Sequence, residues 1–245
     1  MTRPVLRPHT GRVFEPSSKA RLTKHDLARF PGDSLFHRIA RVVCEAGCLP
    51  RKELFESWEV ARRVRRRFRG GRVVDLCGGH GLLGQILLLL DDSSPGALIV
   101  DRVLPASAAT LHKALLKVWP RLKSRVTFRA TDLHGVLLSE NDVVASIHAC
   151  GNLTDVVLQL AVEARAHVAV LPCCHDLRTC QTGGLSGWLD GPLAVDVNRV
   201  TRLEAAGFQI WTQTIPENIT PQNRLLMAAP LALSVARSSE SVIRA

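Results

Sequence analysis

Residues 73–84, VVDLCGGHGLLG, are the stretch of the sequence that predicts the fold. Two valines lead to the acid Asp75, then Gly78, Gly79 and Gly81 follow, and leucine and isoleucine recur with helical spacing. This order predicts a strand, a turn and a helix. Because glycine lacks a Cβ, the backbone of such a turn can adopt positive φ and lie directly against a ligand. The first amides of the helix would point at that ligand.

The acid ahead of the glycines separates two cofactor classes. Gly79, Gly81 and Gly84 fit the G-x-G-x-x-G pattern of dinucleotide folds, and Asp101 follows at about the spacing of their ribose-binding acid. Asp75 would repel the pyrophosphate of NAD, whereas it would attract the sulfonium and ammonium groups of S-adenosylmethionine. The order D-x-C-G-G-x-G also resembles the first motif of class I methyltransferases. We therefore expect S-adenosylmethionine as the cofactor, with a dehydrogenase as the less favoured alternative.

The chain after this motif alternates strand and helix patterns, which predicts an α/β fold with a doubly wound, mostly parallel sheet. Strand patterns cover residues 96–103, 126–132, 143–149 and 167–171, and helix patterns cover 106–119, 153–166 and 195–206. Two further strands, 208–215 and 224–231, are joined by a link so short that they must pair antiparallel. We therefore expect a seven-stranded, Rossmann-like sheet that ends in an antiparallel hairpin, as in class I methyltransferases.

Residues 1–71 are expected to form a basic N-terminal arm and a small helical cap, and residues 72–245 the methyltransferase domain. Prolines at positions 4, 8 and 16 discourage helix, so the arm up to about residue 31 should be irregular. Ser34 is placed to cap one helix, and a second opens near Pro50 and ends at Gly70 and Gly71.

The positive charge is confined to this first part of the chain. The whole sequence has a net charge of +10, and residues 1–72 hold 18 Lys and Arg against 7 Asp and Glu. A basic appendage on a nearly neutral domain indicates a polyanionic partner such as RNA. Its densest part, just ahead of the glycine motif, is the run Arg62, Arg63, Arg65, Arg66, Arg67, Arg69 and Arg72. The run predicts phosphate contacts, and a solvated helix end is the alternative. Aromatic residues are few and tyrosine is absent, which favours contact with the backbone of a folded RNA such as tRNA.

Ligands of a doubly wound sheet lie beyond the carboxyl ends of its strands. Asp75 is expected to hold the methionine part of the cofactor, Asp101 to accept both ribose hydroxyls, and Asp132 to take the adenine amino group. The full set of expected cofactor-binding residues is Asp75, Cys77, Gly78, Gly79, Gly81, Asp101, Asp132, Leu133 and His148.

Two cysteine- and histidine-containing segments, SIHACGNLTD at 146–155 and LPCCHDLRTC at 171–180, follow the fourth and fifth strands. A zinc site is not expected, because C-x-x-C pairs are absent and the adjacent Cys173 and Cys174 are poorly suited to one tetrahedral metal. A cysteine nucleophile is a further, less favoured possibility.

The pattern in these segments resembles the eukaryotic tRNA acceptor-stem 2′-O-methyltransferases and related methyltransferase-like proteins. The matching residues are His148, Cys150, Gly151, Thr154 and Asp155, then Cys173, Cys174 and His175, then Thr220, Pro221 and Asn223. The resemblance implies a class I fold, S-adenosylmethionine as donor and methyl transfer to a ribose hydroxyl of tRNA. The N-terminal zinc-finger modules of that family have no counterpart here, and Ile147 stands where its members have lysine.

A ribose hydroxyl is a weak nucleophile, so a base should help to remove its proton. His148, Asp155 and His175 are the candidate catalytic residues, with Asp155 and His175 preferred. Alternatives are methylation of a small molecule or a protein, and an RNA-binding module that has lost turnover. No signal peptide or membrane span is expected, and seven cysteines without an export signal suit the cytoplasm.

Overall fold

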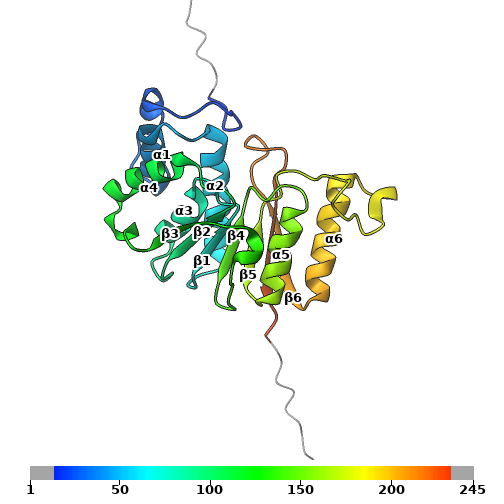
Figure 1. Ribbon diagram of the computed structural model, residues 1–245. Helices are drawn as coiled ribbons and strands as arrows, with labels where there is room; N and C mark the ends of the chain where they lie inside the picture. Colours follow the sequence, from blue (N-terminus) through cyan, green and yellow to red (C-terminus); the bar gives the residue numbers. More distant parts are fainter. Residues whose placement is uncertain (1–13, 233–245) are drawn as a thin grey trace, which may run out of the picture.

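A seven-stranded sheet runs through the molecule in the order β3-β2-β1-β4-β5-β7-β6. The protein is seen here in a computed structural model that describes residues 14–232 (Figure 1). The strands are β1 (Val73–Leu76), β2 (Ala97–Asp101), β3 (Val126–Ala130), β4 (Val143–Ser146), β5 (His167–Val170), β6 (Phe208–Thr214) and β7 (Arg224–Pro230).

The pairing of these strands confirms the predicted sheet. Strands β1 to β5 pair in parallel, and β7 lies antiparallel between β5 and β6. Most strands are shorter than their apolar patterns. The β2–β3 ladder, for example, ends at the pair Asp101 and Ala130. Beyond it the chain turns away, so the apolar Val103 is exposed and belongs to a loop.

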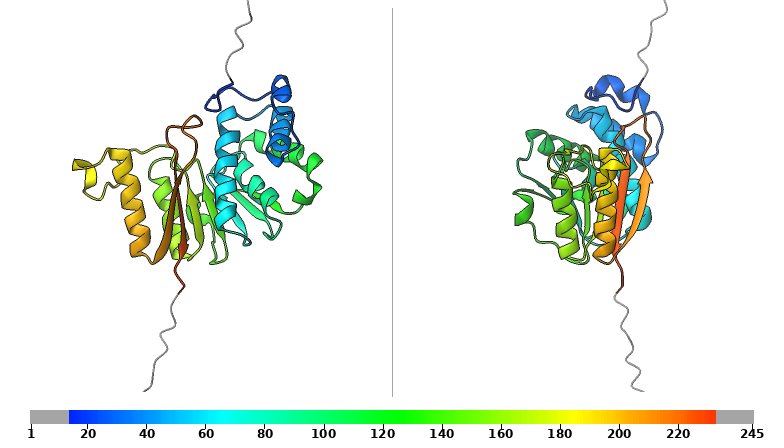
Figure 2. Two further views of the ribbon diagram at one scale, coloured as in Figure 1. Left: turned by 180° about the vertical axis from the view of Figure 1, so that it is seen from behind. Right: turned by 90° about the vertical axis from the view of Figure 1, so that its right-hand side faces the viewer.

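Helices cover both faces of the sheet (Figures 1 and 2). One face carries α1 (Leu35–Ala46), α2 (Arg51–Arg67), α3 (Leu82–Leu90) and α4 (Ala106–Val118), and the other carries α5 (Leu153–Glu163) and α6 (Gly191–Ala205). Alternation along a strand divides the core between them. Val73 belongs to the cluster under α1 to α4, whereas Val74 belongs to the cluster under α5 and α6.

The helices expected as a cap belong to the same layer as α3 and α4. Helix α2 packs along α3, α1 packs along α4, and all four share one apolar cluster with the sheet. Ser34 caps α1 as predicted, accepting a hydrogen bond from the His37 amide at 3.3 Å. The expected irregular arm contains a short 3-10 helix, η1 (Lys24–Arg29), and its first 13 residues lie outside the described part. A domain boundary near residue 71 stays a prediction.

Two edges of the sheet matter for function. The carboxyl edge, where β1 to β5 end, is uppermost in Figure 1, and the amino edge, where they begin, is lowermost. Helix α2 begins at the carboxyl edge and ends at the amino edge, where Arg72 leads into β1. Among residues 14–232, no helix has the length and apolar character needed to cross a membrane.

Candidate active site

The turn between β1 and α3 lies at the carboxyl edge and needs its glycines. Gly79 and Gly81 have φ values of +50° and +73°, in the left-handed region. A Cβ on Gly81 would lie 2.4 Å from Cδ1 of Ile99 on the neighbouring strand β2. A side chain there would displace β2, so the turn can pack this closely on the sheet only with glycine at position 81.

Two carboxylates hold this turn. Asp75 is 1% exposed, and its Oδ2 accepts a hydrogen bond from the Gly84 amide at 2.9 Å. Asp101, at the end of β2, accepts one from the Gly79 amide at 3.0 Å. Burial raises the pKa of Asp75 to about 7; the charge of Asp101 also raises it, and the Gly84 amide opposes the shift. The site thus contains buried negative charge that a cationic ligand would stabilise.

Residues after β3 complete one side of this edge. Asp132 is exposed and precedes the short helix η3 (Leu133–Gly135), in which Leu133 is buried. Because β3 pairs with β2, both residues lie at the carboxyl edge on the side of Asp101. The structure therefore brings the three predicted strand-end acids, Asp75, Asp101 and Asp132, to one edge.

His148 lies on the other side, in the loop that follows β4. Its side chain is half-buried. Burial lowers the pKa of His148 to about 4, the positive charges of Lys52 and His80 lower it further, and Asp101 opposes them. The same interactions show that His148 shares its surroundings with Asp101 and with the start of α2.

The start of α2 supplies polar groups that the sequence did not single out. His80, within the glycine turn, bonds through Nδ1 to Oγ of Ser107 at 2.8 Å, and its Nε2 lies 3.9 Å from Oε2 of Glu53. Burial and the neighbouring Glu56 raise the pKa of Glu53 to about 7, against the influence of Lys52. The i,i+4 spacing of Lys52 and Glu56 is the one feature of the sequence that indicates an ion pair here, and their atoms Nζ and Oε1 are 3.4 Å apart. That spacing does not say which edge of the sheet the helix reaches.

Comparison with known proteins places the chain in a family. A family described as "Methyltransferase domain" matches residues 56–180, which is half of the chain. The chain belongs to this methyltransferase family. Its fold is that of class I methyltransferases, and it is similar to an O-methyltransferase family protein from Burkholderia thailandensis, with a TM-score of 0.50 and 18% identity. That match covers 86% of this chain and 64% of the other.

Curated relatives of the methyltransferase are longer proteins. It is 27% identical over 198 residues to a "Glutathione S-transferase C-terminal domain-containing protein homolog" from Drosophila melanogaster, covering 64% of this chain and 33% of that protein. The human "Glutathione S-transferase C-terminal domain-containing protein" is 30% identical over 106 residues, covering 43% of this chain and 16% of that one. The chain thus spans a third or less of the length of these relatives.

The methyltransferase uses S-adenosylmethionine, and its residues fit this cofactor. A Cβ at Gly79 would have only Oδ2 of Asp101 within 4 Å, so the backbone of the turn is open to a ligand there. The buried Asp75 has a raised pKa, which a cationic ligand would lower by favouring the ionised form. Asp101 uses Oδ2 on the turn, which leaves its other oxygen for a hydroxyl group. These features match a molecule with two positive centres and a ribose.

Two of the three candidate bases are engaged elsewhere. Asp155, in the first turn of α5, lies 2.8 Å from Nη2 of the buried Arg199. His175 lies 2.7 Å from Asp196 through Nε2, and Asp196 also pairs with Arg199 and Arg224. These contacts join the loops after β4 and β5 to α6. Asp155 and His175 are therefore held in an ion network, which is not the open position expected of a base, and His148 lies nearer the glycine turn.

The arginine run does not lie beside the glycine turn, as its place in the sequence suggested. Phe68 stacks on His167 at the start of β5, and the Arg72 carbonyl accepts a hydrogen bond from the amide of Val143 at the start of β4. The end of the run is therefore at the amino edge. The four residues of β1 separate it from the turn at the carboxyl edge.

Four arginines of the run are paired within the protein. Arg62 and Arg63 both bind Glu59, the buried Arg65 lies 3.3 Å from Asp91, and Arg72 lies 2.6 Å from Asp142. The exposed members are Arg66, Arg67 and Arg69, and the Arg67 guanidinium lies over the ring of Trp211 at 4.2 Å. The run therefore offers fewer cations to a partner than its composition suggests.

Proposed function

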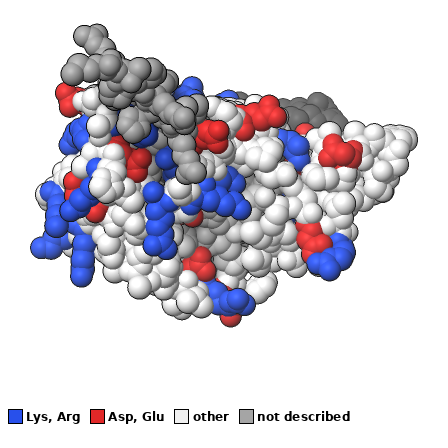
Figure 3. All heavy atoms as spheres, turned by 90° about the horizontal axis from the view of Figure 1, so that it is seen from above, with Lys and Arg blue, Asp and Glu red and all other residues white. Residues whose placement is uncertain are grey.

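We propose that this methyltransferase acts on RNA and transfers its methyl group to a ribose 2′-hydroxyl of tRNA. The observation that carries the proposal is the presence of Lys and Arg side chains, among them Arg21 and Lys52, at the carboxyl edge. Residues 14–34 and the start of α2 lie over the carboxyl edge, and Lys and Arg side chains lie mainly in the left and central parts of that face (Figures 1 and 3). Arg21 is close enough to the glycine turn to lower the pKa of His80. A polyanion would thus be drawn to the edge where the cofactor lies.

The resemblance to tRNA 2′-O-methyltransferases supports the choice of acceptor. Its three matching segments lie after β4, after β5 and between β6 and β7, all at the carboxyl edge. In the third, Thr220 is buried, and Nδ2 of Asn223 donates to the carbonyl of Ile215 at 3.1 Å. Residues far apart in the sequence therefore come to the same edge of the sheet, which supports a shared role in binding the acceptor.

For the cofactor, we assign Asp75 to the ammonium group and Asp101 to the ribose hydroxyls. Asp132 and Leu133 would contact adenine by hydrogen bonding and by apolar packing, respectively. The backbone from Cys77 to Gly81 would lie along the bound molecule. Support comes from the burial of Asp75, the unused oxygen of Asp101 and the bare turn. Bound S-adenosylmethionine supplies an electrophilic methyl group on its sulfonium.

On the acceptor side, His148 is assigned to receive a hydrogen bond from the hydroxyl and to take its proton. It is half-buried at the carboxyl edge between the glycine turn and the loop of Asp155. Asp155 and His175 act as positioning residues, because their ion network fixes the loops after β4 and β5. Holding a nucleophile in line with the methyl group is the main requirement for this transfer.

RNA would be held at two places. Arg21 and Lys52 face the incoming acceptor at the carboxyl edge, and the exposed Arg66, Arg67 and Arg69 contact phosphates nearer the amino edge. Each phosphate contact that is lost should reduce the slope of log affinity against log salt by about 0.7 to 0.9. Cofactor affinity should be unchanged by substitutions in either group.

The test is transfer of labelled methyl groups from S-adenosylmethionine to purified tRNA, ribosomal RNA, total protein and a small-molecule extract. Label in 2′-O-methylnucleosides after nuclease digestion is the expected result. Label in a base would refute the ribose assignment, and label only in protein or small molecules would refute the RNA substrate.

Matched variants separate the roles at the site. His148→Ala should abolish transfer while the cofactor still raises the melting temperature. Arg66→Glu with Arg69→Glu should weaken RNA binding. Arg129→Glu, at an exposed arginine on the outermost strand β3, is the control and should leave RNA binding unchanged. Full transfer by His148→Ala would remove that residue from the chemistry.

A further inference from the structure

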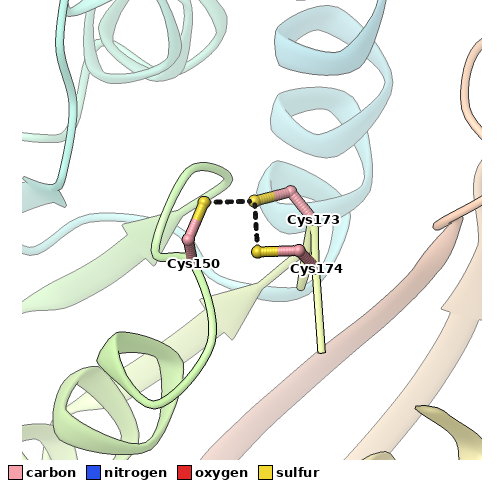
Figure 4. A group of neighbouring side chains, drawn as sticks. All are labelled: Cys150, Cys173 and Cys174. Atoms are coloured by element: carbon pink, nitrogen blue, oxygen red, sulfur yellow. Dashed lines mark hydrogen bonds between the residues drawn. The ribbon is translucent and has the colours of Figure 1, made fainter. Parts of the chain in front are cut away.

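Three cysteine sulfurs meet at the carboxyl edge, beside the predicted acceptor site. Cys150 lies in the loop after β4, and Cys173 and Cys174 follow β5 (Figure 4). The Sγ atoms of Cys150 and Cys173 are 3.1 Å apart, those of Cys173 and Cys174 are 4.0 Å apart, and all three lie within 4.8 Å of one another.

Main-chain contacts hold these cysteines in register. Strands β4 and β5 pair in parallel, so the two loops leave the sheet side by side. Gly151 has a φ of +58°, and its amide donates to the Cys174 carbonyl at 3.3 Å. The adjacency of Cys173 and Cys174, which argued against a shared metal, is no obstacle, because both sulfurs point toward Cys150 (Figure 4).

The sulfur spacing suits a metal ion. Zn–S bonds of about 2.3 Å in tetrahedral geometry place sulfurs roughly 3.8 Å apart, between the two distances observed here. Thiolates also select thiophilic cations over Mg²⁺ or Ca²⁺.

We propose that Cys150, Cys173 and Cys174 bind one thiophilic divalent cation of the zinc class through three thiolates, with a fourth position open to solvent. Each thiol gives up its proton to water as its sulfur binds the metal, so binding releases protons without any redox change. Within residues 14–232, no fourth Cys, His, Asp or Glu joins this group. Cys180 is buried beside Arg199, and His175 is paired with Asp196.

A bound ion would clamp the loops after β4 and β5 to each other. These loops carry His148 on one side and the Asp155 network on the other. The metal site would therefore stabilise the acceptor side of the active site, while the glycine turn on the neighbouring strand β1 would be unaffected. Its existence does not depend on which acceptor is methylated.

The test is a titration of the whole, chelator-treated and reduced protein with Cd²⁺ and Zn²⁺. We expect one ion per chain, sulfur-to-cadmium charge-transfer absorption, proton release, and no competition from Mg²⁺. Cys150→Ser and Cys174→Ser should each weaken binding at least about ten-fold. Cys48→Ser, which changes a half-buried thiol outside the group, should leave binding intact.

Folding of the variants is checked by their thermal unfolding and by their stabilisation with S-adenosylhomocysteine, whose assigned contacts at Asp75, Asp101 and Asp132 lie outside the cysteine loops. Metal should also slow hydrogen exchange at residues 147–152 and 171–176. Absence of stoichiometric binding, or undiminished binding by both variants that retain cofactor stabilisation, would overturn the proposal.

Discussion

Replacing Asp75 by Asn tests the cofactor site directly. Asn keeps an oxygen for the Gly84 amide but removes the charge. Loss of a charged contact with the cofactor should weaken binding by about 2 kcal/mol, roughly thirty-fold, at pH 8. Because the pKa of Asp75 in the free protein is raised to about 7, binding to the ionised form should be about ten-fold weaker at pH 6 than at pH 8. The Asn variant should lack this roughly ten-fold dependence of cofactor affinity on pH.

The same substitution should increase the stability of the protein without cofactor. A buried carboxyl whose folded pKa is raised above 3.8 costs stability above that unfolded value, and the cost is complete above about pH 7. It disappears as the pH falls below the unfolded pKa. Asp75→Asn should therefore increase the free energy of unfolding at pH 8 by up to about 4 kcal/mol, with no difference near pH 3.

Calorimetric titration with S-adenosylmethionine and S-adenosylhomocysteine at pH 6, 7 and 8 measures the first effect, and urea denaturation measures the second. Ionisation of the ligand's own amino group affects both proteins equally, so the ratio of the two dissociation constants isolates Asp75. An identical pH dependence in both proteins, or a less stable Asn variant at pH 8, would refute this account of the site.

Three further changes give distinct outcomes. Gly81→Ala, at a φ of +73° and with a Cβ too close to β2, should lower stability by more than about 1 kcal/mol and abolish cofactor stabilisation in a melt. Arg199→Met would leave the charges of Asp155 and Asp196 without their buried partner. The free energy of unfolding, measured by urea denaturation, should fall by about 3–5 kcal/mol. An unchanged midpoint would contradict this. Glu53→Gln should be more stable than the native protein at pH 8 and equally stable below about pH 4.5. The reason is that this buried carboxyl, whose pKa is raised to about 7, destabilises the fold only when it is ionised. A variant that is less stable than the native protein at pH 8 would contradict this.

Much of the fold was predictable because its determinants are local. The acid, three glycines and helical leucines of residues 75–87 specify a strand, turn and helix without reference to the rest of the chain. The nine residues between β6 and β7 fix an antiparallel pairing by their length alone. Strand ends were less predictable, since apolar residues such as Val103 continue past the last ladder pair.

The arginine run shows why neighbours in sequence can have distant positions. A strand carries the chain from one edge of the sheet to the other, so Arg72 and Gly78 face opposite edges although only β1 and Cys77 separate them. Acids such as Glu59, Asp91 and Asp142 also pair with arginines of the run, so fewer arginines can bind a ligand than the composition suggests.

The ion pairs of Asp155 and His175 depend on residues that the sequence motifs did not connect with them. Asp155 lies in the first turn of α5 and His175 in the loop after β5, but their pairing is decided by Asp196 and Arg199 on α6. Nothing in the spacing of these residues indicates that α6 would bring a buried arginine to the start of α5. Likewise, the meeting of three cysteines follows from the pairing of β4 with β5 and could not be deduced from C-C adjacency.

The link between α6 and the two loops also constrains the order of folding. Arg199 reaches back 44 residues in the chain to Asp155. Contacts of such separation form only after the intervening chain has been ordered, so their entropic cost falls late in folding. Residues 73–101, by contrast, can build the glycine turn from nearby segments. The glycine turn should therefore form before the opposite wall of the site becomes rigid.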